Sequence, residues 1–199
     1  MGGKFPEHGN PSPNLGARFL PFDTGNYLFS TQSVLTEGAQ SAAFRELNRL
    51  VVKTEGLGAS TATTRLVDGW YKAGDALDKL YVPGDALTGW RESTEKSDFY
   101  RDVIARSCRT CHTALGQQFN WDDRPARFAS DPNSRDATVL AHVCGGQKDL
   151  AVNASMPNAL ASLDRLLDAN VSNAAEIKSR MLKYLGCTAP VPDPVYPRR

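Results

Sequence analysis

Apolar side chains recur at three- and four-residue steps in several separate segments, which predicts a mostly helical chain. The first segment runs from Glu37 to Lys53 with Thr36 as a candidate N-cap, and the second covers residues 62–72. The residues expected to face inward in these two helices are Ala39, Ala43, Phe44, Leu47, Leu50, Val51, Leu66, Val67, Trp70 and Tyr71.

The second half of the chain repeats this pattern. A helix over residues 97–107, capped by Ser97 or Asp98, is expected to deliver Cys108 at its C-terminal end. Helical patterns follow at 137–143 and 160–170, and a last helix begins near a capping box of Asn173 and Glu176. The residues expected to face inward in the first and last of these helices are Phe99, Tyr100, Val103, Ile104, Ile177, Met181, Leu182 and Leu185.

The remaining segments show no period. Residues 1–35 are rich in proline and glycine and predict an irregular arm, and its aromatic residues indicate that it packs against something. A turn-rich linker is expected up to about Ser93, and the tail carries four prolines. We therefore divide the chain into an N-terminal region (1–93), a helical domain (94–189) and an extended tail (190–199).

One short motif carries chemistry. Residues 108–112 read C-x-x-C-H, the attachment signature of c-type haem. Cys108 and Cys111 would form thioethers to the two vinyl groups of one haem, and His112 would offer a ring nitrogen to the iron. The motif therefore predicts one covalent haem c.

Three alternatives to haem remain at this motif. A thioredoxin-like dithiol also uses C-x-x-C, but it sits where a strand turns into a helix, and no β-branched run precedes Cys108. A structural zinc site would need paired ligands from a second cluster, whereas Cys144 and Cys187 stand alone. The third alternative is two buried cysteines beside an unrelated histidine.

Composition narrows the class of protein. The chain has 199 residues, with 23 basic and 22 acidic side chains and a formal charge of +1, which argues against a nucleic-acid binder. No apolar run is long enough for a transmembrane segment.

The start has no apolar signal region, yet haem c is attached outside the cytoplasm, so we expect a removed targeting segment and a periplasmic or extracellular protein. Cys144 and Cys187 would then form a disulfide or remain two buried thiols.

Residues 97–187 resemble class I cytochrome c. The resemblance rests on a helix leading into C-x-x-C-H, a Met156-Pro157 dipeptide 44 residues after the histidine, and a final amphipathic helix. It implies a cytochrome c-like fold that wraps the haem, preceded here by a helical and irregular N-terminal region without a counterpart in a minimal cytochrome c.

The resemblance also implies a set of ligands. His112 would be the proximal and Met156 the distal iron ligand, and His/Met ligation raises the reduction potential. Pro125 would accept a hydrogen bond from the other ring nitrogen of His112, or it is simply a turn proline. The side chains that would reach the propionates, or for the arginines form surface ion pairs instead, are Trp121, Arg124 and Arg127.

The distal ligand has rivals. His142 would give bis-histidine ligation and a lower potential, but a lone histidine in a helical stretch is more often structural. Met181 lies on the apolar face of the last helix, where methionine is usually core filler. An open sixth position is the remaining alternative to Met156.

Three functions from different classes follow. The first is a monohaem electron carrier that meets extracytoplasmic redox partner proteins in small, transient encounters. The second is a haem enzyme or a sensor of peroxide or a diatomic gas, with the N-terminal half forming a distal pocket. The third is a structural haem subunit that docks into a larger complex, or associates with itself, through the N-terminal region.

Overall fold

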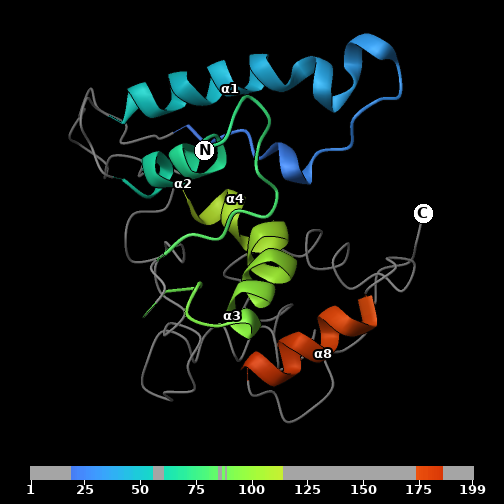
Figure 1. Cartoon of the computed structure of the whole chain (residues 1–199), viewed down its shortest axis with the longest axis vertical. Helices are drawn as coiled ribbons and strands as arrows, with labels where there is room; N and C mark the ends of the chain where they lie inside the picture. Colours follow the sequence, from blue (N-terminus) through green and yellow to red (C-terminus); the bar gives the residue numbers. More distant parts are fainter. Residues whose placement is uncertain (1–18, 56–60, 85–86, 88, 114–173, 186–199) are drawn as a thin grey trace, which may run out of the picture. The chain divides into compact units, whose positions relative to one another are not determined.

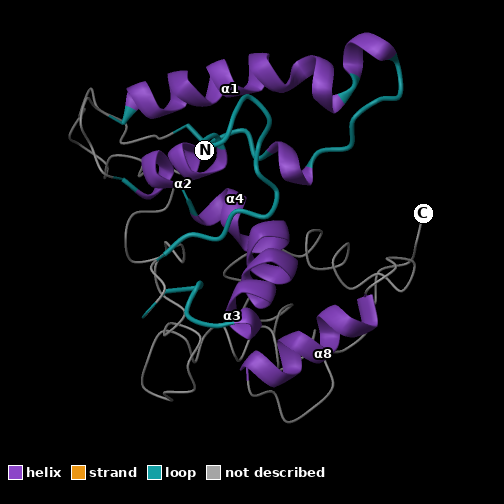
Figure 2. Cartoon of the chain, in the orientation of Figure 1, coloured by secondary structure: helices purple, strands orange, loops and turns teal. Residues whose placement is uncertain are grey.

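A computed structural model of the chain describes residues 19–55, 61–84, 87, 89–113 and 174–185. Within these ranges the chain is helical with no strand, as Figure 2 shows, so the predicted mostly α class is confirmed there. The described residues fall into two compact units. The first comprises 19–83 and 109–113, and the second comprises 84–108 and 174–185, each with the gaps given above.

The first unit contains helix α1 (Glu37–Thr54) packed against helix α2 (Ala62–Trp70) (Figure 1). Each begins at a threonine cap: Thr36 Oγ1 accepts from Ala39 N at 3.3 Å, and Thr61 Oγ1 accepts from Thr64 N at 3.2 Å. These caps satisfy backbone donors that a helix start leaves without partners. The core of the unit consists of Leu66, Val67, Trp70, Tyr71 and Leu77, with Val52 and Tyr81 packed against it.

The segment 19–35 is irregular apart from two single 3₁₀ turns, η1 (Thr24–Asn26) and η2 (Ser33–Leu35). It packs on α1, whereas the sequence predicted only that the arm packs against something. Asn48, which is 0% exposed, accepts from Phe22 N at 2.7 Å and donates to Phe22 O at 3.0 Å. The Phe22 ring lies 5.9 Å from the ring of Phe44 on α1. The Asn48 side chain thus anchors the arm to α1 by hydrogen bonds with both backbone polar groups of Phe22.

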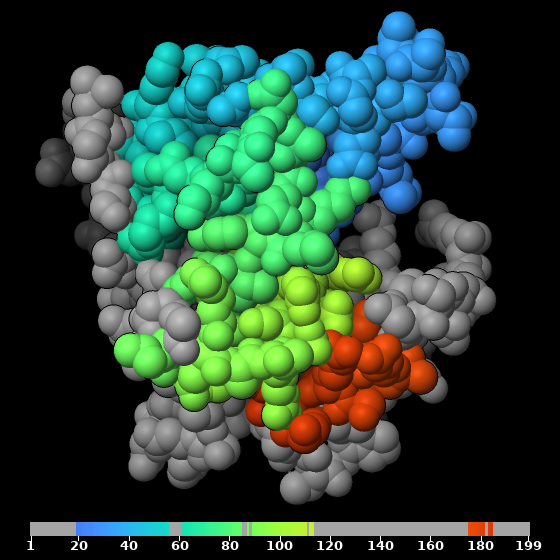
Figure 3. Space-filling view, in the orientation of Figure 1, coloured from blue at the N-terminus to red at the C-terminus, as the bar shows by residue number. Residues whose placement is uncertain are grey.

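The second unit contains helix α3 (Thr94–Phe99), which continues as a nine-residue π-helix, η3 (Tyr100–Cys108), and the last helix, α8 (Ala174–Leu185). Helix α8 packs against α3 and η3, and the red and yellow-green atoms of these helices meet in Figure 3. Tyr184 of α8 stacks on Phe99 with ring centroids 4.1 Å apart, and Trp90 packs beside both rings. Aromatic pairs at such distances stabilise beyond the area that they bury.

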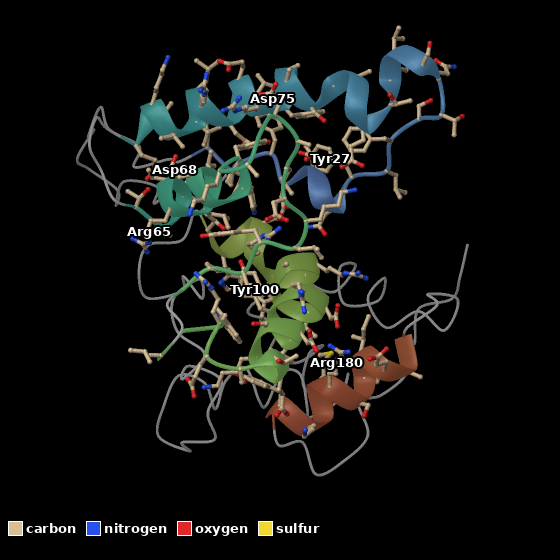
Figure 4. The ribbon with its side chains drawn as sticks, viewed as in Figure 1. Tyr27, Arg65, Asp68, Asp75, Tyr100 and Arg180 are labelled. Atoms are coloured by element: carbon tan, nitrogen blue, oxygen red, sulfur yellow. The ribbon has the colours of Figure 1, made fainter. Side chains whose placement is uncertain are left out.

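Ion pairs also join α8 to α3 and η3. Arg180 lies 3.2 Å from Asp98 Oδ2 and 2.8 Å from Asp102 Oδ2, and it pairs with Glu176 on its own helix (Figure 4). Its pKa is raised, first by the hydrogen bond to Glu176 and then by the carboxylates around it, against the opposing effect of burial. Lys183 pairs with Glu95 at 2.9 Å. These bridges are partly exposed, so each contributes little.

Two sequence predictions about these helices are wrong. Leu47 and Leu50 were expected inward on α1, but they are 39% and 55% exposed, and the nearby alanines 39 and 43 are exposed as well. The buried face runs instead through Asn48 and Val51, because the three hydrogen bonds of Asn48 compensate the burial of its amide. The helix expected to start at Ser97 or Asp98 begins earlier, since Ser93 Oγ accepts from Lys96 N at 3.2 Å.

The other predicted inward residues agree with the structure where it describes them. Val51, the α2 set, the four inward residues of the third helix, Ile177 and Met181 are all buried, and Phe44 is half-buried. The side chains of Leu182 and Leu185, the cap Asn173 and the helices predicted at 137–143 and 160–170 lie outside the described residues. The predicted domain of 94–189 includes parts of both units and stays a prediction. No helix of the described ranges is long and apolar enough to cross a membrane.

Candidate functional site

The C-x-x-C-H motif coincides with the end of a helix. Cys108 is the last residue of η3, and Arg109–His112 forms the short helix α4. Cys108 is half-buried, with Sγ 3.3 Å from Ser107 Oγ, and His112 is half-buried. Cys111 follows Cys108 by three positions along helical backbone, which is close to one turn, and positions at this spacing are neighbours on a helix.

The first variable residue of the motif is held by a buried ion pair. Arg109 donates from Nε to Asp23 Oδ2 at 2.9 Å and from Nη2 to Asp23 Oδ1 at 2.8 Å. The side chains are 6% and 1% exposed, respectively. This is the bidentate fork that arginine forms with a carboxylate, and removal of one partner from such a buried pair costs about 3–5 kcal/mol.

Further contacts fix the same turn. Thr110 Oγ1 donates to Asp23 Oδ2 at 3.3 Å, so the carboxylate contacts two consecutive residues of the motif. After the histidine, Thr113 donates from its backbone N at 2.9 Å and from Oγ1 at 2.6 Å to the Arg109 carbonyl. Residues on both sides of His112 are therefore held by hydrogen bonds, Thr110 to Asp23 through its side chain and Thr113 to the Arg109 carbonyl.

Trp70 of α2 completes the surroundings of Arg109. The guanidinium carbon lies 4.9 Å from the centre of the Trp70 ring, within the range of a cation–π contact. The indole Nε1 of Trp70 is buried and has no hydrogen-bond partner in the described part of the chain, although nearly all buried polar groups have one.

Besides Arg109, the described residues that donate a hydrogen bond to Asp23 are uncharged. Asn26 donates to Asp23 Oδ2 at 3.1 Å. Burial raises the pKa of Tyr27, and the carboxylate of Asp23 raises it further. Burial likewise raises the pKa of Tyr71, while the hydrogen bond from Asn48 opposes this effect. Both phenols are therefore neutral at physiological pH, and Asp23 and Arg109 form the buried ion pair of this site.

The structure describes only part of the predicted site. Cys108 ends η3, His112 ends α4, and the backbone of Cys111 lies between them within α4, while the binding of haem by these residues stays a prediction. The remaining residues predicted to bind haem or to form the disulfide lie outside the described residues. These are Trp121, Arg124, Pro125, Arg127, Met156 and the rival His142, together with Cys144 and Cys187.

Sequence reasoning missed the residues that hold the motif in place: Asp23, Arg109 and Trp70. Asp23 follows the sequence Phe19-Leu20-Pro21-Phe22, and an acidic residue next to an apolar run in a packed arm is a signal for a buried ion pair. Arg109 was read only as a variable position of the motif. No local pattern links two residues that are 86 positions apart.

A covalent haem fits these residues. The two cysteines and the histidine would supply the thioethers and one iron ligand, and the half-buried positions of Cys108 and His112 leave both side chains partly accessible. The Trp70 indole is a buried donor that needs an acceptor, and haem propionates carry acceptor oxygens. The donor set and this indole are thus consistent with a bound haem near α4.

Comparison of the chain with protein-family models, with curated proteins and with solved structures gave no match.

Proposed function

We propose that the protein is a monohaem c-type cytochrome that carries single electrons between extracytoplasmic redox proteins. The observation that carries the proposal is the complete C-x-x-C-H motif at the C-terminal end of a helix. A redox dithiol would need a preceding strand, and none occurs in the described residues before Cys108.

The packing of the second unit supports the resemblance to class I cytochrome c. The helix that leads into the motif and the last described helix pack against each other through Phe99, Tyr184 and the Arg180 ion pairs. This is the pairing that the resemblance requires of its first and last helices. Residues 94–189 would form the haem-wrapping domain, with Ala105, which is 8% exposed, at the place of the small residue in the first helix.

Each predicted residue has a role in this proposal. Cys108 and Cys111 attach the haem, and His112 and Met156 hold the iron, which supplies a one-electron couple between Fe(III) and Fe(II). The carbonyl of Pro125 would accept a hydrogen bond from the other ring nitrogen of His112 and fix the tautomer of the imidazole. Trp121, Arg124 and Arg127 would bind the propionates. The leucines that follow Met156 would exclude water from the haem face and favour the reduced iron.

An absorption spectrum of the oxidised and reduced protein tests the proposal. We expect a low-spin haem c with the weak near-infrared band of ferric iron that has a sulfur ligand. Met156→Ala should abolish this band and lower the potential by about 0.1–0.3 V, a modest part of the range that axial ligands set. The control is His142→Ala, which should leave the band and the reduction potential unchanged. If His142→Ala changes the spectrum and Met156→Ala does not, the carrier is bis-histidine.

A further inference from the structure

The ion pair of Asp23 and Arg109 joins the N-terminal arm to the inside of the haem-attachment motif. Both side chains are almost wholly buried, and both oxygens of the carboxylate are engaged. Arg109 directly follows Cys108 and lies three positions before His112. A displacement of Arg109 therefore displaces the backbone that carries the iron ligand.

The pair also has an electrostatic consequence. One cation and one anion cancel, and the other groups in contact with Asp23, Thr110 and Asn26, are uncharged. The nearby phenols of Tyr27 and Tyr71 have raised pKa values and remain neutral. Loss of either partner changes the net charge of this buried place by one unit, and a buried charge acts over a long distance because the protein interior screens it poorly.

We propose that Asp23 is a positioning residue of the haem site, which orients His112 through Arg109 and neutralises the arginine charge so that it does not raise the reduction potential. This inference rests on the proposed function and extends it, because it assigns part of the haem site to a region without a counterpart in a minimal cytochrome c. Residues 19–35 are then an integral part of the electron-transfer site.

The sign of the expected effects follows from charge. The oxidised iron centre carries one more positive charge than the reduced one. In Asp23→Asn one buried negative charge is removed, which disfavours the oxidised state and raises the potential. In Arg109→Gln the carboxylate remains without its cation, which favours the oxidised state and lowers the potential. The double variant removes both charges and returns the potential toward that of the wild type.

The test is a redox titration of the haem protein and these three variants. The matched control is Asp75→Asn, which removes the same charge from an exposed ion pair with Arg45 in the same unit (Figure 4). We expect opposite shifts for the two single variants, a smaller shift for the double variant, and no shift for Asp75→Asn. Shifts of the same sign, or a control shift as large as that of Asp23→Asn, would overturn the inference.

Two variants that keep both charges test the positioning role. Arg109→Lys and Asp23→Glu should leave the potential near that of the wild type but change the paramagnetic NMR shifts of the His112 ring, because the fork geometry is lost. These variants carry the test if Asp23→Asn does not yield folded protein. Unchanged His112 shifts in both variants would refute the inference. A wild-type protein without haem would instead refute the proposed function.

Discussion

Asn48 offers the sharpest test of how the arm is held. Its amide is fully buried and makes three hydrogen bonds, two with the backbone of Phe22 and one, 2.9 Å long, from Nδ2 to the Tyr71 hydroxyl. Asn48→Ala removes all three. The backbone N–H and carbonyl of Phe22 and the phenol of Tyr71 then lose a partner in a partly or fully buried place.

The expected cost follows from these groups. A buried polar group left without its partner costs about 1–3 kcal/mol, and we take about 1.5 for the buried Tyr71 phenol and about 1 for the N–H of half-buried Phe22. The Phe22 carbonyl adds only about 0.5 because Thr24 N still donates to it at 3.0 Å. Alanine is a better helix former than asparagine by about 0.5 kcal/mol, which offsets part of the loss. The free energy of unfolding should therefore fall by about 2–3 kcal/mol.

Urea unfolding followed by far-UV circular dichroism measures this change. The matched control is Gln40→Ala on the same helix, whose amide makes an exposed hydrogen bond to the Leu35 carbonyl and should cost less than about 0.5 kcal/mol. If Asn48→Ala costs no more than this control, Asn48 does not hold the arm.

A second variant at the same position adds a pH signature. In Asn48→Asp the new carboxyl is buried, so its pKa is raised above the unfolded value of about 3.9. The folded state then binds a proton more readily than the unfolded state, and stability increases as the pH falls through the folded pKa. Asn48→Ala has no such group, and its deficit should be the same across that pH window.

Three further predictions concern other parts of the chain. A Cβ at Gly69 would overlap the Tyr81 ring, so Gly69→Ala should destabilise the wild type in thermal unfolding. In the Tyr81→Ser background the ring is absent, so the same change should stabilise the protein by up to about 1 kcal/mol. Destabilisation in both backgrounds would contradict the contact. Burial raises the pKa of Tyr184 above 10.0, so the folded state keeps this proton where the unfolded state loses it. The free energy of unfolding should therefore fall as the pH rises above about 10. Tyr184→Phe should reduce that fall, and an unchanged pH profile in this variant would count against the burial of the phenol. The predicted Cys144–Cys187 disulfide should leave no thiol to label at these positions in the unfolded, unreduced protein, and two labelled thiols would refute it.

The helices were predictable because their apolar periods are local. The sets Leu66, Val67 and Trp70, and Phe99 and Tyr100, are buried as their spacing predicts. The buried face of α1 was not predictable in this way, because an apolar pattern assigns a polar residue to the surface. The burial of Asn48 depends on its hydrogen bonds with Phe22, which lies 26 positions away, so no local pattern predicts it.

The residues of the candidate site also differ in whether a local pattern predicts them. The cysteine and histidine positions of the motif follow from chemistry that requires one fixed spacing, so the sequence alone identifies them. The support of the motif by Asp23 depends on a contact over 86 positions and on a geometry that only the folded chain supplies. Charge balance does not reveal such a pair in advance, because most acidic and basic residues are solvated.

Intact-mass spectrometry of protein from a host that attaches haem c tests the central claim most directly. We predict that the mass exceeds that of the polypeptide by one haem and that this excess survives denaturation and acid extraction, because thioethers to Cys108 and Cys111 do not dissociate. Cys108→Ser together with Cys111→Ser should lose the excess. A wild-type mass equal to that of the bare chain would contradict the account.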